Sequence, residues 1–325
     1  MAHFKRSQRK YVKKTYRVRN WHEYEAGLRE RGSLTVWISL DDGKLTNWDA
    51  PRPKKRKPGR QRKYSNHAIE TAVTLGMVFG MASRQTEGFI GSLFTLLNLN
   101  NDVPDHTTIS RRKAKLRNVP FCEIKKKTPV HILIDSSGLT VHVGQFRKPP
   151  KIRDYRKLHL CVDEVTGNVV ACDLTSKSAR DASRVPSLIK QIDRRILSAR
   201  ADTAYDTGRV YEAIENHRAH HSPKVLIPPR KDAQLASTSA TTRQRNRNIR
   251  EQARLGKRKW HKESGYSKRS KVETAFYRYR LIIGPSMRSR RLVSQRVEAR
   301  IGCKILNTMT ELGMGAADKA ASLVG

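Results

Sequence analysis

Three acidic residues stand where their carboxylates could bind a metal ion together. Asp135 follows the apolar, β-branched segment VHILI, Asp202 ends the segment ILSARAD, and Glu273 lies within YSKRSKVETAFYRYR. Mg²⁺ and Mn²⁺ prefer hard oxygen ligands, and such ions can activate a water or a hydroxyl for attack at phosphorus. The residue types therefore predict metal-dependent chemistry at a phosphodiester.

Each acid also has an ordinary structural alternative. Asp135 and Asp202 can each close a strand with an Asx turn, and Asp202 can cap the helix that follows. Asp206, four residues later, is the rival of Asp202 for the same role. Glu273 can form a surface pair with Arg269 worth about 0.3 kcal/mol. The order of the three acids, on two strands and a late helix, favours a shared site.

The helix predicted around Glu273 places charged groups on one stripe. Arg269, Glu273, Phe276 or Tyr277, and Arg280 fall at offsets that repeat with the helical period. An acid between two arginines on the same face suits a metal ligand that works beside DNA phosphates.

The elements that must position these acids are strands and helices over residues 128–315. Strands are expected at 130–135, 158–176 (a hairpin turning at Thr166-Gly167-Asn168), 196–202 and 224–229, with helices at 181–195 and 208–220. This order predicts an α/β fold with a mixed sheet, an RNase H-like, retroviral integrase-like core. Further helices are expected at 266–283 and 293–312, after a basic insertion at about 230–265.

The N-terminal part reads as two further units. Residues 1–65 form a basic flexible arm, and its stretch 51–65 is either a phosphate-binding arm or a solvated linker. Residues 66–120 form a helical domain that Asn66 begins. Its last helix, opened by Asp105, predicts a helix-turn-helix; the alternative is a small helical subdomain with a solvated charged face. The residues expected to face DNA are Thr107, Thr108, Arg111, Arg112 and Lys113.

Charge indicates the partner. The chain of 325 residues has 67 Lys and Arg against 29 acidic residues, a formal net charge of +38. Such an excess attracts polyanions, with nucleic acid the commoner partner and an anionic membrane the competitor. No apolar run is long enough to span a bilayer, and no secretory signal is expected. The four cysteines form no CxxC pair, so we expect free thiols in a reducing cytoplasm.

Three motifs resemble a known family. The pattern Tyr266-xx-Arg269-xxx-Glu273-xxxxxx-Arg280 resembles the Y-R-E-K signature of bacterial insertion-sequence DDE transposases of the insertion-sequence-four superfamily, with arginine for the final lysine. ADTAYD resembles the motif of the second aspartate, and LIDSSGL that of the first. KLHLCVDEVTG resembles the hairpin that follows the first-aspartate motif. Within the superfamily the chain resembles the insertion-sequence-five group, and the similarity covers roughly residues 65–315.

The resemblance implies a function and its parts. Asp135, Asp202 and Glu273 would bind two Mg²⁺ or Mn²⁺ ions, while Tyr266, Arg269 and Arg280 hold phosphates. The protein would bind terminal inverted repeats, cleave the DNA and transfer the strand to target DNA, as a homodimer in the bacterial cytoplasm, associated with the nucleoid and not with membrane. A non-catalytic DNA-binding protein or repressor derived from a transposase is the alternative, and a nuclease without strand transfer is a third.

Overall fold

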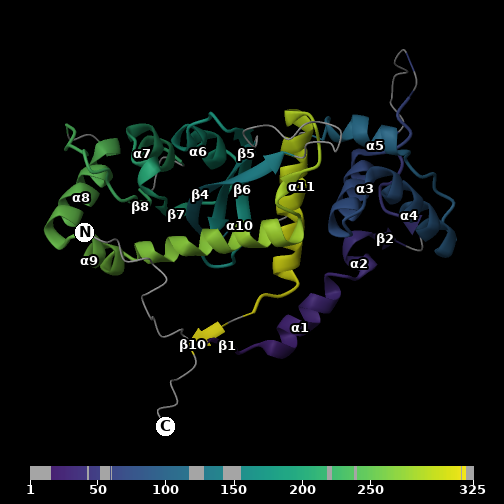
Figure 1. Ribbon diagram of the computed structural model, residues 1–325, viewed down its shortest axis with the longest axis horizontal. Helices are drawn as coiled ribbons and strands as arrows, with labels where there is room; N and C mark the ends of the chain where they lie inside the picture. The colour runs from purple at the N-terminus through teal and green to yellow at the C-terminus, as the bar shows by residue number, and fades with distance from the viewer. Residues whose placement is uncertain are drawn as a thin grey trace, which may run out of the picture.

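The computed structural model describes residues 16–41, 44–51, 59, 61–116, 128–141, 155–217, 222–237, 240–315 and 317–319. A mixed β-sheet forms its centre, with helices on both faces and a helical unit at one end (Figure 1). No helix among the described residues is long and apolar enough to cross a membrane.

The sheet has the strand order β6-β5-β4-β7-β8. Strands β4 (Val130–Val141), β5 (Tyr155–Asp163) and β6 (Val169–Ser176) form an antiparallel meander. Strands β7 (Ile196–Arg200) and β8 (Lys224–Leu226) continue from β4 in parallel. The short β9 (Ser286–Met287) pairs with the end of β4. This mixed sheet is consistent with the predicted RNase H-like core.

Alternating residues of β4 divide the core between the two faces. Ile132 and Ile134 pack against α6 (Val185–Ile189) and α7 (Gly208–Glu215), whereas Leu133 and Leu139 pack on the side of α10 (Lys271–Ile282) and α11 (Leu292–Glu311). Because side chains alternate along a strand, Asp135 shares the face of Leu133 and looks toward α10.

The helical unit contains α3 (Asn66–Val78), α4 (Ser83–Leu96) and α5 (His106–Lys113). These helices were predicted, although Ser65 rather than Asn66 caps α3, since its hydroxyl accepts from the Ala68 amide. The unit lies against α11 at one end of the sheet (Figure 1), where Lys304 pairs with Glu70 at 2.6 Å. One apolar core runs from α3 and α4 through α11 to the sheet.

Residues 1–65 were expected to form a flexible arm, and their described part differs. It contains α1 (Trp21–Glu30), α2 (Leu34–Trp37) and the short strands β1 (Tyr16–Val18), β2 (Leu40–Asp41) and β3 (Lys44–Leu45). Trp37 and Trp48 are buried in the main core, which explains why this basic segment is ordered. Most of the stretch 51–65 lies outside the described residues.

Three other expectations change in detail. Strand β4 was expected to end at Asp135 but continues to Val141, because β5 pairs with it along this length. The helix expected at 181–195 is shorter, since Pro186 lies in the first turn of α6 after a 3₁₀ turn, η2 (Asp181–Arg184). Within the basic insertion, α8 (Ala240–Leu255) and α9 (Lys257–Glu263) are well-formed helices.

Candidate active site

The parallel register of β4 and β7 brings two of the predicted acids to the same level. Leu133 pairs with Arg200, the last residue of β7; Asp135 lies two residues further along β4, and Asp202 lies two residues beyond the end of β7. Side chains two residues apart in a strand point to the same face, so Asp135 faces α10, and Asp202 is close enough for its charge to act on Asp135. Asp202 is half-exposed and accepts a hydrogen bond from the Ala204 amide at 2.9 Å, so it also has its expected turn role.

The third acid, Glu273, is connected to Asp135 through the side chain of Arg269. Arg269 lies in the 3₁₀ turn η4 (Tyr266–Ser270) that opens into α10. Its guanidinium donates to Asp135 Oδ2 at 2.7 Å and to Glu273 Oε1 at 3.0 Å. The Asp135 side chain is 16% exposed and that of Glu273 is 61% exposed. The cluster therefore lies at the surface, with Asp135 on its more buried side.

Burial and charge act on the protonation of this cluster. Burial raises the pKa of Asp135, and the charge of Asp202 acts in the same direction, whereas the Ser136 amide and Arg269 lower it. Burial lowers the pKa of Arg269, but Asp135, Tyr266 and Glu273 outweigh it, and the net direction is upward. Arg269 therefore stays charged between the acids.

The other members of the predicted phosphate-binding set lie on either side of Arg269. Tyr266 is buried against Trp260 and His261, and burial raises the pKa of its hydroxyl. Arg280 is exposed and donates to the Ser137 hydroxyl. Of the two aromatic alternatives on the stripe, Phe276 is buried and Tyr277 is 64% exposed, so Tyr277 belongs to the outer face.

Asp206 has a different environment from Asp202. Its side chain is fully buried and receives Arg245 Nε at 2.8 Å and the Arg230 amide at 3.1 Å. Both carboxylate oxygens are used within the fold, which leaves Asp202 as the member of this pair that is open to solvent.

The chemistry of the cluster suits a divalent cation. Asp135 and Glu273 already share a cation, the guanidinium of Arg269, and Asp202 adds a third hard oxygen donor. In the described part of the chain, no three His, Cys, Asp or Glu side chains lie close enough to hold one ion together. Because Arg269 pairs with two of these carboxylates, a metal ion held by Asp135 and Glu273 would compete with its guanidinium.

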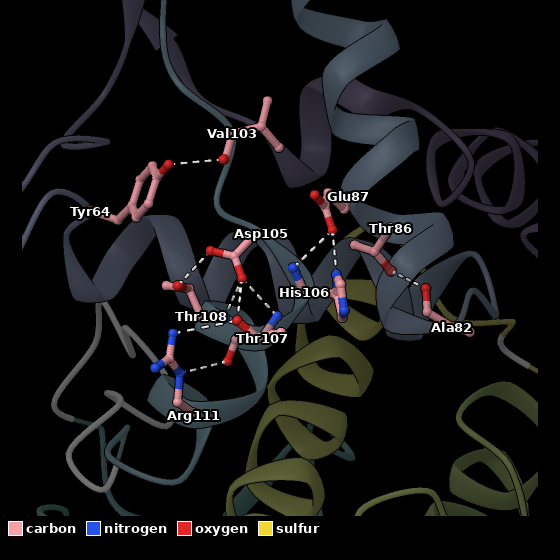
Figure 2. Close-up of polar contacts among 10 residues, drawn as sticks. All are labelled: Tyr64, Ala82, Thr86, Glu87, Val103, Asp105, His106, Thr107, Thr108 and Arg111. Atoms are coloured by element: carbon pink, nitrogen blue, oxygen red, sulfur yellow. Dashed lines mark hydrogen bonds and ion pairs between the residues drawn. The ribbon is translucent and has the colours of Figure 1, made fainter.

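The predicted DNA-facing residues of α5 divide into two groups. Asp105 caps the helix, accepting from the amides and hydroxyls of Thr107 and Thr108 (Figure 2), and these bonds lower its pKa. Thr107 and Arg111 are exposed, and Arg111 donates to the carbonyl and hydroxyl of Thr107.

Arg112 and Lys113 do not face outward as predicted. Arg112 donates to the Tyr64 carbonyl and to Asn66, and Lys113 donates to Ser289 at 2.8 Å and pairs with Glu298 at 3.2 Å. Both side chains hold α5 against neighbouring segments, because the last turn of this short helix packs on the core.

A buried ion-pair network beside the cluster was not predicted. Arg200 pairs with Glu164 and donates to the Gly265 carbonyl, and Lys268 pairs with the same Glu164 at 2.8 Å. This network fastens the start of η4 to the end of β7. The signal in the sequence was a charged residue inside the apolar segment ILSAR, two positions before Asp202.

Comparison with known families gives an independent result. Residues 126–307 match the transposase DDE domain family, and residues 29–144 match a second family of the same description. The first match covers more than half of the chain. This chain belongs to the DDE transposases. No solved structure matches it. DDE transposases are enzymes of phosphoryl transfer that bind DNA and generally use divalent metal.

Proposed function

We propose that this transposase cleaves DNA at the terminal inverted repeats of an insertion sequence and joins the freed ends to target DNA. The observation that carries the proposal is the position of Asp135 and Asp202, each two residues beyond the Leu133–Arg200 pair of β4 and β7, beside the Arg269–Glu273 pair. The Y-R-E-K-like spacing supports assignment to the insertion-sequence-five group of the insertion-sequence-four superfamily.

In this proposal the three acids are the metal ligands. Asp135, Asp202 and Glu273 would hold two Mg²⁺ or Mn²⁺ ions, which supply an activated nucleophile and charge stabilisation at phosphorus. Arg269 and Arg280 donate charge-assisted hydrogen bonds to phosphates next to the scissile bond. Tyr266, packed on Trp260, fixes the start of η4 and thereby the position of Arg269. Water attacks first, and the resulting 3′-hydroxyl attacks the target.

The helical unit is the proposed reader of the inverted repeats. Helix α5 follows α4 after residues 97–105, and it exposes Thr107 in its first turn and Arg111 one turn later. In a helix-turn-helix the N-terminal residues of the recognition helix contact base edges. We assign residues 66–120 to DNA recognition and residues 128–315 to catalysis. Because each transposon end needs its own active site, we propose a homodimer in the synaptic complex.

The test is a cleavage and joining assay on DNA that carries the element's own ends, with Mg²⁺ or Mn²⁺. We expect Asp135→Asn, Asp202→Asn and Glu273→Gln each to reduce cleavage by at least about a thousandfold while DNA binding persists. Asp232→Asn, at an exposed acid outside the cluster, is the control. Full cleavage by any of the three variants would remove that residue from the site. Binding without cleavage by the wild type would favour a repressor.

A further inference from the structure

Helix α8, in the basic insertion, has a composition that its fold does not explain. It contains five arginines and one acid, Glu251, in 16 residues. A helix that is polar on all sides buries no apolar face, so other contacts must stabilise it. The polar contacts of α8 with the core stabilise it, and they show which of its faces remains exposed to solvent.

Polar side chains hold α8 against the catalytic core. Asn248 donates to the Tyr211 hydroxyl at 3.1 Å and to the Val225 carbonyl at 3.0 Å, and it is buried. Arg245 pairs with Asp206, four residues after Asp202. The helix is therefore fixed to the loop that carries a proposed metal ligand.

The opposite face of α8 is an arginine stripe, which consists of Arg243, Arg247, Arg250 and Arg254. All four are exposed, and their spacings of four, three and four residues place them on one side of the helix. At 1.5 Å per residue the stripe extends about 16 Å, the length of about five base pairs of duplex DNA.

Two of the four arginines have acidic neighbours. Arg247 pairs with Glu251 at 2.8 Å, and Arg243 lies close enough to lower the pKa of Glu215, which burial raises. Among the described residues, Arg250 and Arg254 form no ion pair. Uncompensated like charge on a rigid helix costs stability unless a polyanion binds there.

The positive surface continues toward the active site. Helix α9 begins after Gly256 and exposes Lys257, Arg258 and Lys262, while its Trp260 is buried against Tyr266. A duplex in contact with α8 and α9 would therefore lie on the surface that leads to Arg269.

We infer that α8 is a DNA-backbone clamp: its arginine stripe binds phosphates of duplex DNA that extends beyond the active site, in addition to contacts made by α5. The inference rests on the proposed function for its partner. Because phosphate contacts carry no sequence information, the clamp adds affinity and holds the duplex in position without selecting the repeat sequence.

The experiment compares two triple variants of equal charge. Arg250→Gln, Arg254→Gln and Arg258→Gln together remove three charges from this surface. Arg180→Gln, Lys190→Gln and Arg209→Gln remove three exposed charges at the ends of η2, α6 and α7, none of which belongs to the arginine stripe or to α9. Affinity for a 30-base-pair duplex of random sequence is measured by fluorescence anisotropy between 50 and 200 mM NaCl, with thermal unfolding as the check on folding.

We expect the α8–α9 triple to reduce the slope of log affinity against log salt by about 3, and the control triple to leave it unchanged. The loss of wild-type affinity across this salt range would then exceed that of the α8–α9 triple by about 40-fold. The corresponding Arg→Lys triple keeps the charge and should retain the slope.

Other outcomes overturn the inference. Equal losses in both triples would show that only net charge matters, and no loss in either would show that α8 does not contact DNA. If the α8–α9 triple fails to fold, single Arg250→Gln and Arg254→Gln variants, each expected to lower the slope by about 1, decide the matter. Failure of the wild type to bind duplex DNA would instead refute the proposed function.

Discussion

Asp202 and Asp206 lie four residues apart in the same loop but have different environments. Asp202 is half-exposed beside Asp135, whereas the carboxylate of Asp206 is fully buried and paired with Arg245. The sequence motif ADTAYD favoured Asp202, but only the three-dimensional contacts explain what Asp206 does. One acid is available for chemistry, and the other stabilises the loop and α8.

This difference predicts separable effects of substitution. Asp206→Ala should lower the free energy of unfolding by about 3 kcal/mol, because it leaves the half-buried Arg245 and the Arg230 amide without their buried partner. Asp202→Asn should leave stability within about 0.5 kcal/mol, since asparagine also caps a turn, while cleavage is lost. Denaturant unfolding and the cleavage assay measure the two effects, and a stable, fully active Asp202→Asn variant would reverse the assignment.

Arg269 yields a second prediction at this scale. Its spacing to Glu273 was readable in the sequence, but its bond to Asp135, 134 residues away, was not. Because its guanidinium lies between two proposed metal ligands, Arg269→Gln should strengthen Mn²⁺ binding to the DNA-free protein by about tenfold or more. Paramagnetic resonance of Mn²⁺ provides the measurement.

Arg280 provides the matched control for this measurement. It lies in α10, which directly follows the 3₁₀ turn that carries Arg269, and it contacts Ser137 rather than an acid. Arg280→Gln removes the same charge and should change Mn²⁺ affinity much less than Arg269→Gln does. Equal affinities of the two variants would mean that Arg269 does not compete with metal.

Among the elements, α5 combines two functions along eight residues. Thr107 in its first turn is exposed, and its last turn is tied to α11 by the pair between Lys113 and Glu298. The basic composition of α5 gives Arg111 and Lys113 the same expected role at DNA, but in the structure Arg111 is exposed and Lys113 pairs with Glu298. Composition could not separate them, because the packing partner of Lys113 lies 185 residues away.

We expect Lys113→Ala and Arg111→Ala to have opposite effects. Lys113→Ala leaves the buried Glu298 unpaired and should cost about 3 kcal/mol of unfolding free energy, measured with denaturant. Arg111→Ala should preserve stability and weaken binding to the inverted repeat. If Lys113→Ala were fully stable and weakened DNA binding only, Lys113 would face DNA after all.

The same pair predicts a pH dependence. Burial raises the pKa of Glu298, but Lys113 and three hydrogen bonds at Arg288 and Ser289 outweigh it, so the net direction is downward from 4.5. An acid whose pKa is lower in the folded than in the unfolded protein stabilises the fold at pH values above its unfolded pKa. This stabilisation is lost as the pH falls through the pKa of the folded protein. Stability should therefore fall with acidification below about pH 4.5, less steeply in Glu298→Gln.

In the whole molecule, one core joins parts that the sequence separates. The order of strands and helices in 128–315 was predictable, because apolar periodicity identifies each element locally. The burial of Trp37 and Trp48 was not, because it depends on packing against the helical unit. Nor was the pairing of β1 with β10 (Ala317–Lys319), which joins the two ends of the described chain. The shared core predicts one cooperative unfolding transition.

A substitution at Gly27 tests whether α1 packs against the end of α11. A Cβ atom at Gly27 would lie 2.4 Å from the Leu312 carbonyl oxygen, so Gly27→Ala must displace α1 from the end of α11. We expect a loss of about 1–3 kcal/mol in unfolding free energy, even though alanine favours helices. Gly88→Ala in α4, where the added Cβ meets open space, should instead stabilise by up to about 1 kcal/mol. Equal changes in both variants would show that α1 is not docked.

The central claim is that Asp135, Asp202 and Glu273 share divalent metal. Its most direct test is Mn²⁺ titration, followed by paramagnetic resonance, of the complex between the transposase and DNA that carries the element's end. The account predicts at least about tenfold weaker Mn²⁺ binding in Asp135→Asn, Asp202→Asn and Glu273→Gln, and wild-type binding in Asp232→Asn. Wild-type Mn²⁺ affinity in all three variants would contradict it.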